Sequence, residues 1–185
     1  MKRTIFFITL ATMVTAASAD AIDIAADQQY LLLATTKSST MQKELSEAAD
    51  QGFRVAASST TSGAEMVSFL ERVASPPDVY RYQLLATTRT GTMQKELNEV
   101  AEQGFHLIPK SIIAKQQLVG GTEIVVLMER PPQATKGYEY KLLATSRTST
   151  LQKEVREAQA AGFSIVGMVS RDEHMVVMER EFDLK

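Results

Sequence analysis

Three tandem copies of one segment restrict the fold of this chain more than any other feature of its sequence. The copies span residues 30–53, 82–105 and 140–163, and they align without a gap. Of the 24 aligned positions, 12 are identical in all three copies. Such self-similarity indicates one repeated structural unit, whose copies bury surface on one another.

The similarity continues beyond these segments. Each copy closes with an apolar run that ends in Glu-Arg, at Arg72, Arg130 and Arg180. The next opening tyrosine stands ten positions after each of the first two arginines. The stretch between the Gly-Phe pair and the closing run varies in length, which is typical of a loop. We therefore place three repeats at residues 28–73, 79–131 and 137–183.

Each repeat reads as β-α-β-β. In the opening strand, Tyr30, Leu32 and Ala34 share one face at period two, and Leu31 and Leu33 share the other. Apolar residues at helical spacing follow, as at Met41 and Leu45 in the first copy. The helices are expected to begin near a threonine whose hydroxyl caps them, at Thr40, Thr92 and Thr150. They are expected to end at a glycine that takes the left-handed conformation, at Gly52, Gly104 and Gly162.

The closing strand of each repeat is apolar on both faces, as residues 124–128 show. Such a strand is usually central and covered on both sides, yet one helix covers only one face. The other face must therefore meet a neighbouring unit or a partner. The fold class is α+β, with three tandem βαββ repeats, each a three-stranded sheet with one helix. We favour pseudo-threefold packing with the helices outside, because the two linkers have equal length; a row with an apolar face left for another chain is the alternative.

The order of a Tyr-x-Tyr strand, a short helix, a Gly-aromatic pair and a hairpin resembles a small bacterial βαββ domain family of unknown function. Residues 138–141, which read Tyr-Glu-Tyr-Lys, and the pair Gly162 and Phe163 match this pattern best. The resemblance covers each unit once, so the family's domain would be present as three tandem copies. It supports the fold and implies no activity.

The first nineteen residues have the pattern of a secretory signal. Lys2 and Arg3 precede an apolar stretch, and small residues before Asp20 suit cleavage near Ala19. We therefore expect a periplasmic or secreted protein without a stable membrane anchor after cleavage. The formal net charge of −2 gives no basic face for a nucleic-acid partner. The absence of cysteine excludes disulfides, a thiol nucleophile and a thiolate metal site.

The loop before each helix is the most repeated polar feature. Hydroxyls, one cation and the free N–H groups of a helix start form an arrangement that can bind an anion or a partner. The alternative is that the hydroxyls cap the helix and the cation pairs with a carboxylate. The candidate residues are Lys37, Thr40, Arg89, Thr92, Arg147 and Thr150.

Other polar features favour structural roles. The Gln-Lys-Glu triplet of each helix is expected on a solvated face. The closing Glu-Arg pairs are expected to form salt bridges between units rather than a metal site. His106 and His174 occupy non-equivalent positions and are expected at the surface. We assign no catalytic residue, metal ligand or cofactor.

The long connection in the second repeat carries four apolar residues, Ile112, Ile113, Leu118 and Val119. Apolar residues in a long loop often mark a contact site, and we expect this loop to dock on a neighbouring unit or a partner chain. The sequence as a whole favours an exported, non-enzymatic binding or scaffolding protein, whose partner is another envelope protein or itself. The alternatives are a subunit of a homo-oligomeric envelope assembly and an enzyme of unknown reaction.

Overall fold

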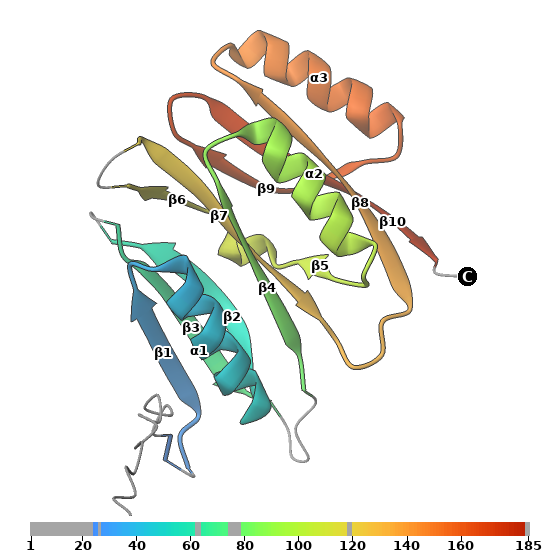
Figure 1. Cartoon of the computed structure of the whole chain (residues 1–185). Helices are drawn as coiled ribbons and strands as arrows, with labels where there is room; N and C mark the ends of the chain where they lie inside the picture. The colour runs from blue at the N-terminus through green and yellow to red at the C-terminus, as the bar shows by residue number, and fades with distance from the viewer. Residues whose placement is uncertain (1–23, 26, 62–63, 74–78, 118–119, 184–185) are drawn as a thin grey trace, which may run out of the picture.

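The computed structural model describes residues 24–25, 27–61, 64–73, 79–117 and 120–183, so the expected signal at residues 1–19 lies outside the described residues. Within them the chain is α+β, and its three βαββ units follow one another across Figure 1, each with one helix and one sheet.

The elements follow the same order in every unit. Unit 1 consists of β1 (Tyr30–Thr35), α1 (Ser38–Asp50), β2 (Phe53–Thr60) and β3 (Met66–Arg72). Unit 2 consists of β4 (Arg81–Thr87), α2 (Thr90–Ala101), β5 (His106–Leu107), the 3-10 turn η1 (Pro109–Ser111), β6 (Ile113–Gln116) and β7 (Thr122–Arg130). Unit 3 consists of β8 (Lys136–Thr145), α3 (Thr148–Ala160), β9 (Ser164–Ser170) and β10 (His174–Asp183).

The closing strand is central in each sheet, as its two apolar faces predict. The strand orders are β1-β3-β2, β4-β7-β5 with β6 also on β7, and β8-β10-β9, and all neighbours are antiparallel. In units 1 and 3 the ladder of the second strand skips one residue, at Ala56 and Val166. Both bulges lie three residues after the Phe of the Gly-Phe pair, so the repeats match in detail.

Unit 2 differs because its second strand is divided. Pro109 has no N–H to donate and therefore cannot continue the ladder, so the strand stops at Leu107 and resumes at Ile113 after η1. The buried Ser111 hydroxyl replaces the missing ladder contacts: its Oγ accepts the N–H of Leu127 at 2.9 Å and donates to the carbonyl of Ile108 at 2.7 Å.

The helix ends agree with the sequence and the helix starts do not. Gly52, Gly104 and Gly162 have φ of 83°, 84° and 89°, the left-handed conformation expected there. Each helix begins two residues before the expected threonine, so Thr40, Thr92 and Thr150 lie inside the first turn. The residues before the helices have extended backbones and no side-chain cap: Lys37, Arg89 and Arg147. Their N–H groups are instead accepted by the hydroxyls that end the opening strands: Thr35, Thr87 and Thr145.

Each sheet has an inner face, which lies against its own helix, and an outer face, which lies opposite. The outer face of unit 2 belongs to the hydrophobic core that α1 and the unit 1 sheet form, through Tyr82, Val125 and Leu127. The outer face of unit 3 joins the core of unit 2 in the same manner, through Tyr140, Met175 and Val177. The inner face of unit 3 packs on α3 in a smaller third core.

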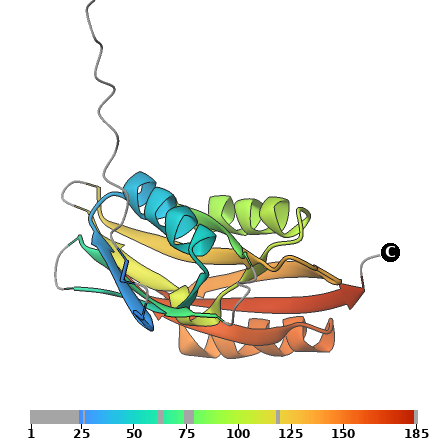
Figure 2. The ribbon, with the colours of Figure 1, turned by 90° about the horizontal axis from the view of Figure 1, so that it is seen from below.

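The expected pseudo-threefold packing is not confirmed. Among the described residues, extensive packing joins unit 1 to unit 2 and unit 2 to unit 3, through α1 on β4 and α2 on β8, and no element of unit 1 packs extensively on one of unit 3. Figure 2 shows α1 and α2 on one side of the strands and α3 on the other. The units therefore follow one another in chain order, each in contact with the next.

Candidate functional site

The sequence-predicted site residues occupy three separate places, one at the start of each helix. Lys37, Arg89 and Arg147 are exposed, and none of them forms a salt bridge within the described part of the chain. The structure therefore does not gather the six candidate residues into one site. It places the first two loops at the contacts between units.

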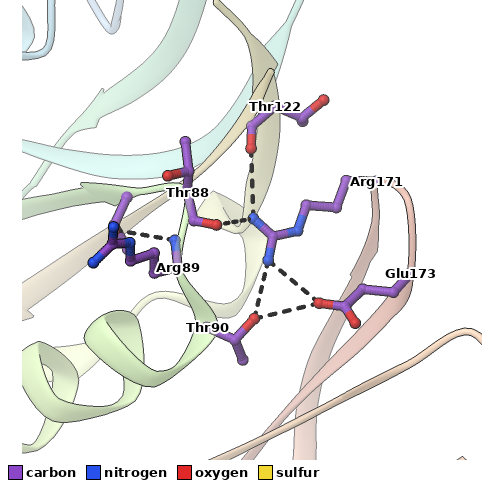
Figure 3. Close-up of polar contacts among 7 residues, drawn as sticks. Thr88, Arg89, Thr90, Thr122, Arg171 and Glu173 are labelled. Atoms are coloured by element: carbon purple, nitrogen blue, oxygen red, sulfur yellow. Dashed lines mark hydrogen bonds and ion pairs between the residues drawn. The ribbon is translucent and has the colours of Figure 1, made fainter. Parts of the chain in front are cut away.

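A cation from the following unit reaches each of these two loops. Figure 3 shows Arg171 of unit 3 donating to the carbonyl of Thr88 at 2.6 Å and to the Thr90 hydroxyl at 3.0 Å. Glu173 holds the guanidinium at 3.3 Å. The equivalent in unit 2 is Lys115, which is 5% exposed.

Lys115 donates to the carbonyl of Thr36 in unit 1 at 3.1 Å and pairs with Glu123 at 3.3 Å. The acidic partners Glu123 and Glu173 stand at matching positions, just before the apolar closing run. The cations do not, because Lys115 and Arg171 come from hairpins of unequal length. An ungapped comparison of the repeats therefore could not identify this contact.

A tyrosine is seated in the preceding unit at both junctions. The Tyr82 hydroxyl accepts the N–H of Val55 at 3.0 Å, and the Tyr140 hydroxyl accepts the N–H of Leu107 at 2.8 Å. Burial of the hydroxyl raises the pKa of both tyrosines well above the usual range, since a phenolate there would lose its hydration. These two positions correspond to Tyr30 of unit 1.

The glutamates of two Glu-Arg pairs contact the preceding unit beside these tyrosines. Arg54 of unit 1 contacts both carboxylate oxygens of Glu129, at 2.5 and 3.1 Å, and stacks on Tyr80. At the second junction, Nε2 of His106 lies 3.0 Å from Glu179, and its ring stacks on Tyr138. The salt bridge between units that was expected of the closing glutamates is present at Glu129. His106 is partly buried at the junction rather than free at the surface.

The glutamine that recurs in each helix also forms hydrogen bonds across the two junctions. Gln42 donates to the carbonyl of Tyr82 at 2.9 Å and accepts the N–H of Leu84 at 2.7 Å. Gln94 repeats the second bond, accepting the N–H of Leu142 at 2.9 Å. These glutamines were expected on a solvated face, and that expectation is wrong for the first two units because an edge strand of the next unit lies against each helix.

The arginines of the Glu-Arg pairs brace their own units. Each lies over the ring of the Gly-Phe phenylalanine, with its Cζ 4.4 to 5.1 Å from the ring centroid. Each also donates to a carbonyl at the end of the helix, where backbone acceptors are otherwise free. The residues concerned are Arg72, Arg130 and Arg180.

The apolar connection of unit 2 lies between the two outer units. Ile113 is buried in the core shared with unit 1, while Ile112 packs on Gly167 of unit 3. A Cβ built on Gly167 would lie 2.3 Å from Cδ1 of Ile112, so a larger residue there would force the Ile112 side chain to move. The other two residues of the candidate contact loop, Leu118 and Val119, lie outside the described residues.

A cavity of about 190 Å³ opens beside the Arg54–Glu129 ion pair, and its lining includes Arg54, His106, Glu129 and Tyr138. The charges of Arg54 and Glu129 are already paired with one another, which leaves neither as a free acid or base. No group of acidic, histidine or cysteine residues suited to hold a metal ion occurs in the described part of the chain.

Comparison with known protein families, curated proteins and solved structures finds no significant match. Among the described residues, no helix combines the length and the apolar character needed to cross a membrane.

Proposed function

We propose that this is an exported, non-enzymatic binding or scaffolding protein that binds another protein chain through the outer face of unit 1. The observation that carries this proposal is the exposure of that face. Tyr30, Leu32 and Phe69 are 62%, 51% and 50% exposed. They form a contiguous apolar surface, since Leu32 and Phe69 are directly paired across β1 and β3.

The other two units show what such a face is suited to contact. Tyr82 and Leu127, which correspond to Tyr30 and Phe69, are 5% and 2% exposed because unit 1 covers them. In unit 3, Tyr140 and Val177 are 2% and 0% exposed beneath unit 2. The same strand face therefore forms the contact with the preceding unit in both unit 2 and unit 3.

The proposal favours a row of units over pseudo-threefold closure. Closure would place the free end of unit 3 on the outer face of unit 1 of the same chain and bury Tyr30. The open row instead keeps both ends accessible to a partner. An enzymatic role is not proposed, because the repeated polar residues described above serve the contacts between units.

Export is the second component of the proposal and rests on the pattern of residues 1–19. Cleavage near Ala19 would leave unit 1 close to the new N-terminus. The mass and N-terminal sequence of the protein recovered from the periplasm or the medium test this component, and recovery of the uncleaved chain from the cytoplasm would contradict it.

The binding component is tested by photo-crosslinking in the producing cell, with p-benzoylphenylalanine in place of Tyr30. We expect a covalent adduct with a protein chain. The matched control places the same residue at Lys43, on the exposed side of α1, where no adduct is expected.

The absence of any adduct from position 30 would contradict the proposal. Replacing Lys37, Arg89 and Arg147 together distinguishes the loops from the face. The triple variant keeps the crosslinking residue at position 30. Loss of the adduct in this variant would assign partner binding to the helix-start loops instead.

A further inference from the structure

The two ends of the row carry complementary halves of one interface. At each internal junction, unit i supplies its helix and the edge of its second strand, and unit i+1 supplies the outer face of its sheet. Unit 1 has no predecessor to cover its outer face, and unit 3 has no successor to cover its helix and second strand.

The side chains that surround Tyr82 in unit 1 show which contacts the free end of unit 3 lacks. Tyr82 lies in one core with Leu45, Phe53 and Leu70, and its hydroxyl binds the N–H of Val55. All four of these unit 1 residues are at most 6% exposed.

The corresponding positions of unit 3 form an open groove of about 210 Å³. Its lining consists of Val155, Gln159, Phe163, Ser164, Ile165 and Met178. Val155, Phe163, Ile165 and Met178 stand where Leu45, Phe53, Val55 and Leu70 surround Tyr82. Ile165 is 56% exposed, whereas its equivalent Val55 is 6% exposed. The groove therefore matches the surroundings of Tyr82 but contains no tyrosine. Tyr30, at the other end of the row, matches Tyr82 but has no such groove to enter.

We propose that copies of this chain associate head to tail, with the outer face of unit 1 of one copy docking on the free end of unit 3 of another. This rests on the proposed function and identifies its partner as a second copy. Tyr30 enters the groove between α3 and β9, and Leu32 and Phe69 cover the apolar surface beside it. The new junction repeats the two junctions inside the chain.

A polar contact of the internal junctions is also available to the second copy. Gln152 matches Gln42 and Gln94, is exposed, and makes no hydrogen bond to another unit within the described residues. In the docked pair its amide reaches the carbonyl of Tyr30 and the N–H of Leu32. Gln28 already donates to that carbonyl at 2.9 Å, and the second lone pair of the oxygen stays available.

The junction between copies lacks one interaction of the internal junctions. Ser164 stands where Arg54 contacts Glu129 and His106 contacts Glu179, so it offers Glu71 neither a guanidinium nor a ring nitrogen there. The association of copies is therefore weaker than the packing of units. Because head-to-tail association joins two different surfaces, every dimer keeps one free unit 1 face and one free unit 3 groove. Further copies can therefore add to it, unless the rotation between successive copies closes a ring.

Two variants, each blocked at one end, test the proposal in solution. Tyr30→Ser with Phe69→Ser removes the apolar anchors of the face, and Ile165→Glu places a charge in the groove opposite Glu71. The altered side chains are all at least 49% exposed, so folding is retained, which circular dichroism and thermal melting verify. Sedimentation velocity then measures each variant alone and an equimolar mixture.

We expect the unaltered protein to form species larger than a monomer as its concentration rises. Each blocked variant alone stays monomeric, with its association constant lowered at least about tenfold. Their mixture forms a one-to-one dimer and nothing larger, because only one complementary pair of ends remains.

Three results would overturn head-to-tail association. These are a monomeric unaltered protein at every concentration, no complex in the mixture, or dimers of the Ile165→Glu variant alone, which would show two outer faces binding each other. A monomeric protein whose Tyr30 crosslinks to a different chain in the cell overturns the second copy as partner but leaves the proposed function standing. A monomeric protein with no crosslink overturns both.

Discussion

At the scale of single residues, identical side chains acquire different roles from their place in the row. The glutamine that follows the first apolar residue of each helix is the clearest case. In units 1 and 2 it binds the backbone of the next edge strand, and in unit 3 it faces solvent. Repetition in the sequence predicts a shared role, whereas the role depends on a neighbour that the last unit lacks.

This difference provides a matched pair of substitutions. Gln42→Ala removes the two hydrogen bonds of this side chain to the next unit and leaves the N–H of Leu84 without its acceptor, so we expect the free energy of unfolding to fall by about 1–2 kcal/mol. Gln152→Ala changes the same residue at the same helix position and should alter it by less than about 0.5 kcal/mol. Urea denaturation at low protein concentration measures both. Equal losses in the two variants would contradict the role given to Gln42.

At the scale of elements, patterns of apolar residues and glycine predicted most of what a unit contains. The central closing strand follows from its two apolar faces, and the helix ends follow from the glycines. The early helix starts were missed because a hydroxyl at the end of the opening strand, Thr35 in unit 1, holds the turn in place of a cap at Thr40.

What the sequence could not predict is which elements of different units meet. The contacts of Lys115 and Arg171 join residues about 80 positions apart, and no local spacing encodes them. The divided second strand of unit 2 likewise depends on a long insertion that the other repeats do not share. The proposed docking face had a signal, since the two apolar faces of the closing strand predicted a surface that a neighbouring unit or a partner covers. The pattern could not tell that unit 1 alone lacks this cover.

The insertion in unit 2 is tested through its closest contact. Ile112→Ala removes a side chain that packs on β9, and we expect a loss of about 1–3 kcal/mol in the free energy of unfolding. We expect Gly167→Ala to destabilise as well, because its Cβ would force Cδ1 of Ile112 out of its packed position. The double variant should be more stable than the sum of the two losses predicts, since the shortened side chain leaves room for the new methyl group.

Ile165→Ala serves as the control for this pair. It removes the same side chain from an exposed position of β9 and should change stability by less than about 0.5 kcal/mol in the monomer. Strict additivity of Ile112→Ala and Gly167→Ala in denaturant unfolding would argue against the contact.

At the scale of the whole molecule, we expect that placing a cation at position 164 strengthens the association of copies. Ser164→Arg places a guanidinium at the position of Arg54, opposite Glu71 of the next copy. We expect the association constant to rise by about two- to fivefold, the range of a partly exposed ion pair. Sedimentation or light scattering at low ionic strength measures the change, and added salt should reduce it.

A second substitution shows whether the gain comes from this pair. Combining Ser164→Arg with Glu71→Gln should return the association constant to that of the unaltered protein. An arginine that strengthens association equally well without Glu71 would indicate a different contact.

The segment of η1 and β6 has a consequence for how the molecule unfolds. Repeat proteins whose units touch only their neighbours can lose a terminal unit while the rest stays folded. Here one insertion in the middle unit packs on β2 of the first unit and on β9 of the third. Fraying at either end therefore exposes the same shared segment, which couples the two ends energetically although they scarcely meet. We therefore expect the three units to unfold as one cooperative body, held together by the insertion of unit 2, which is the least repetitive part of the chain.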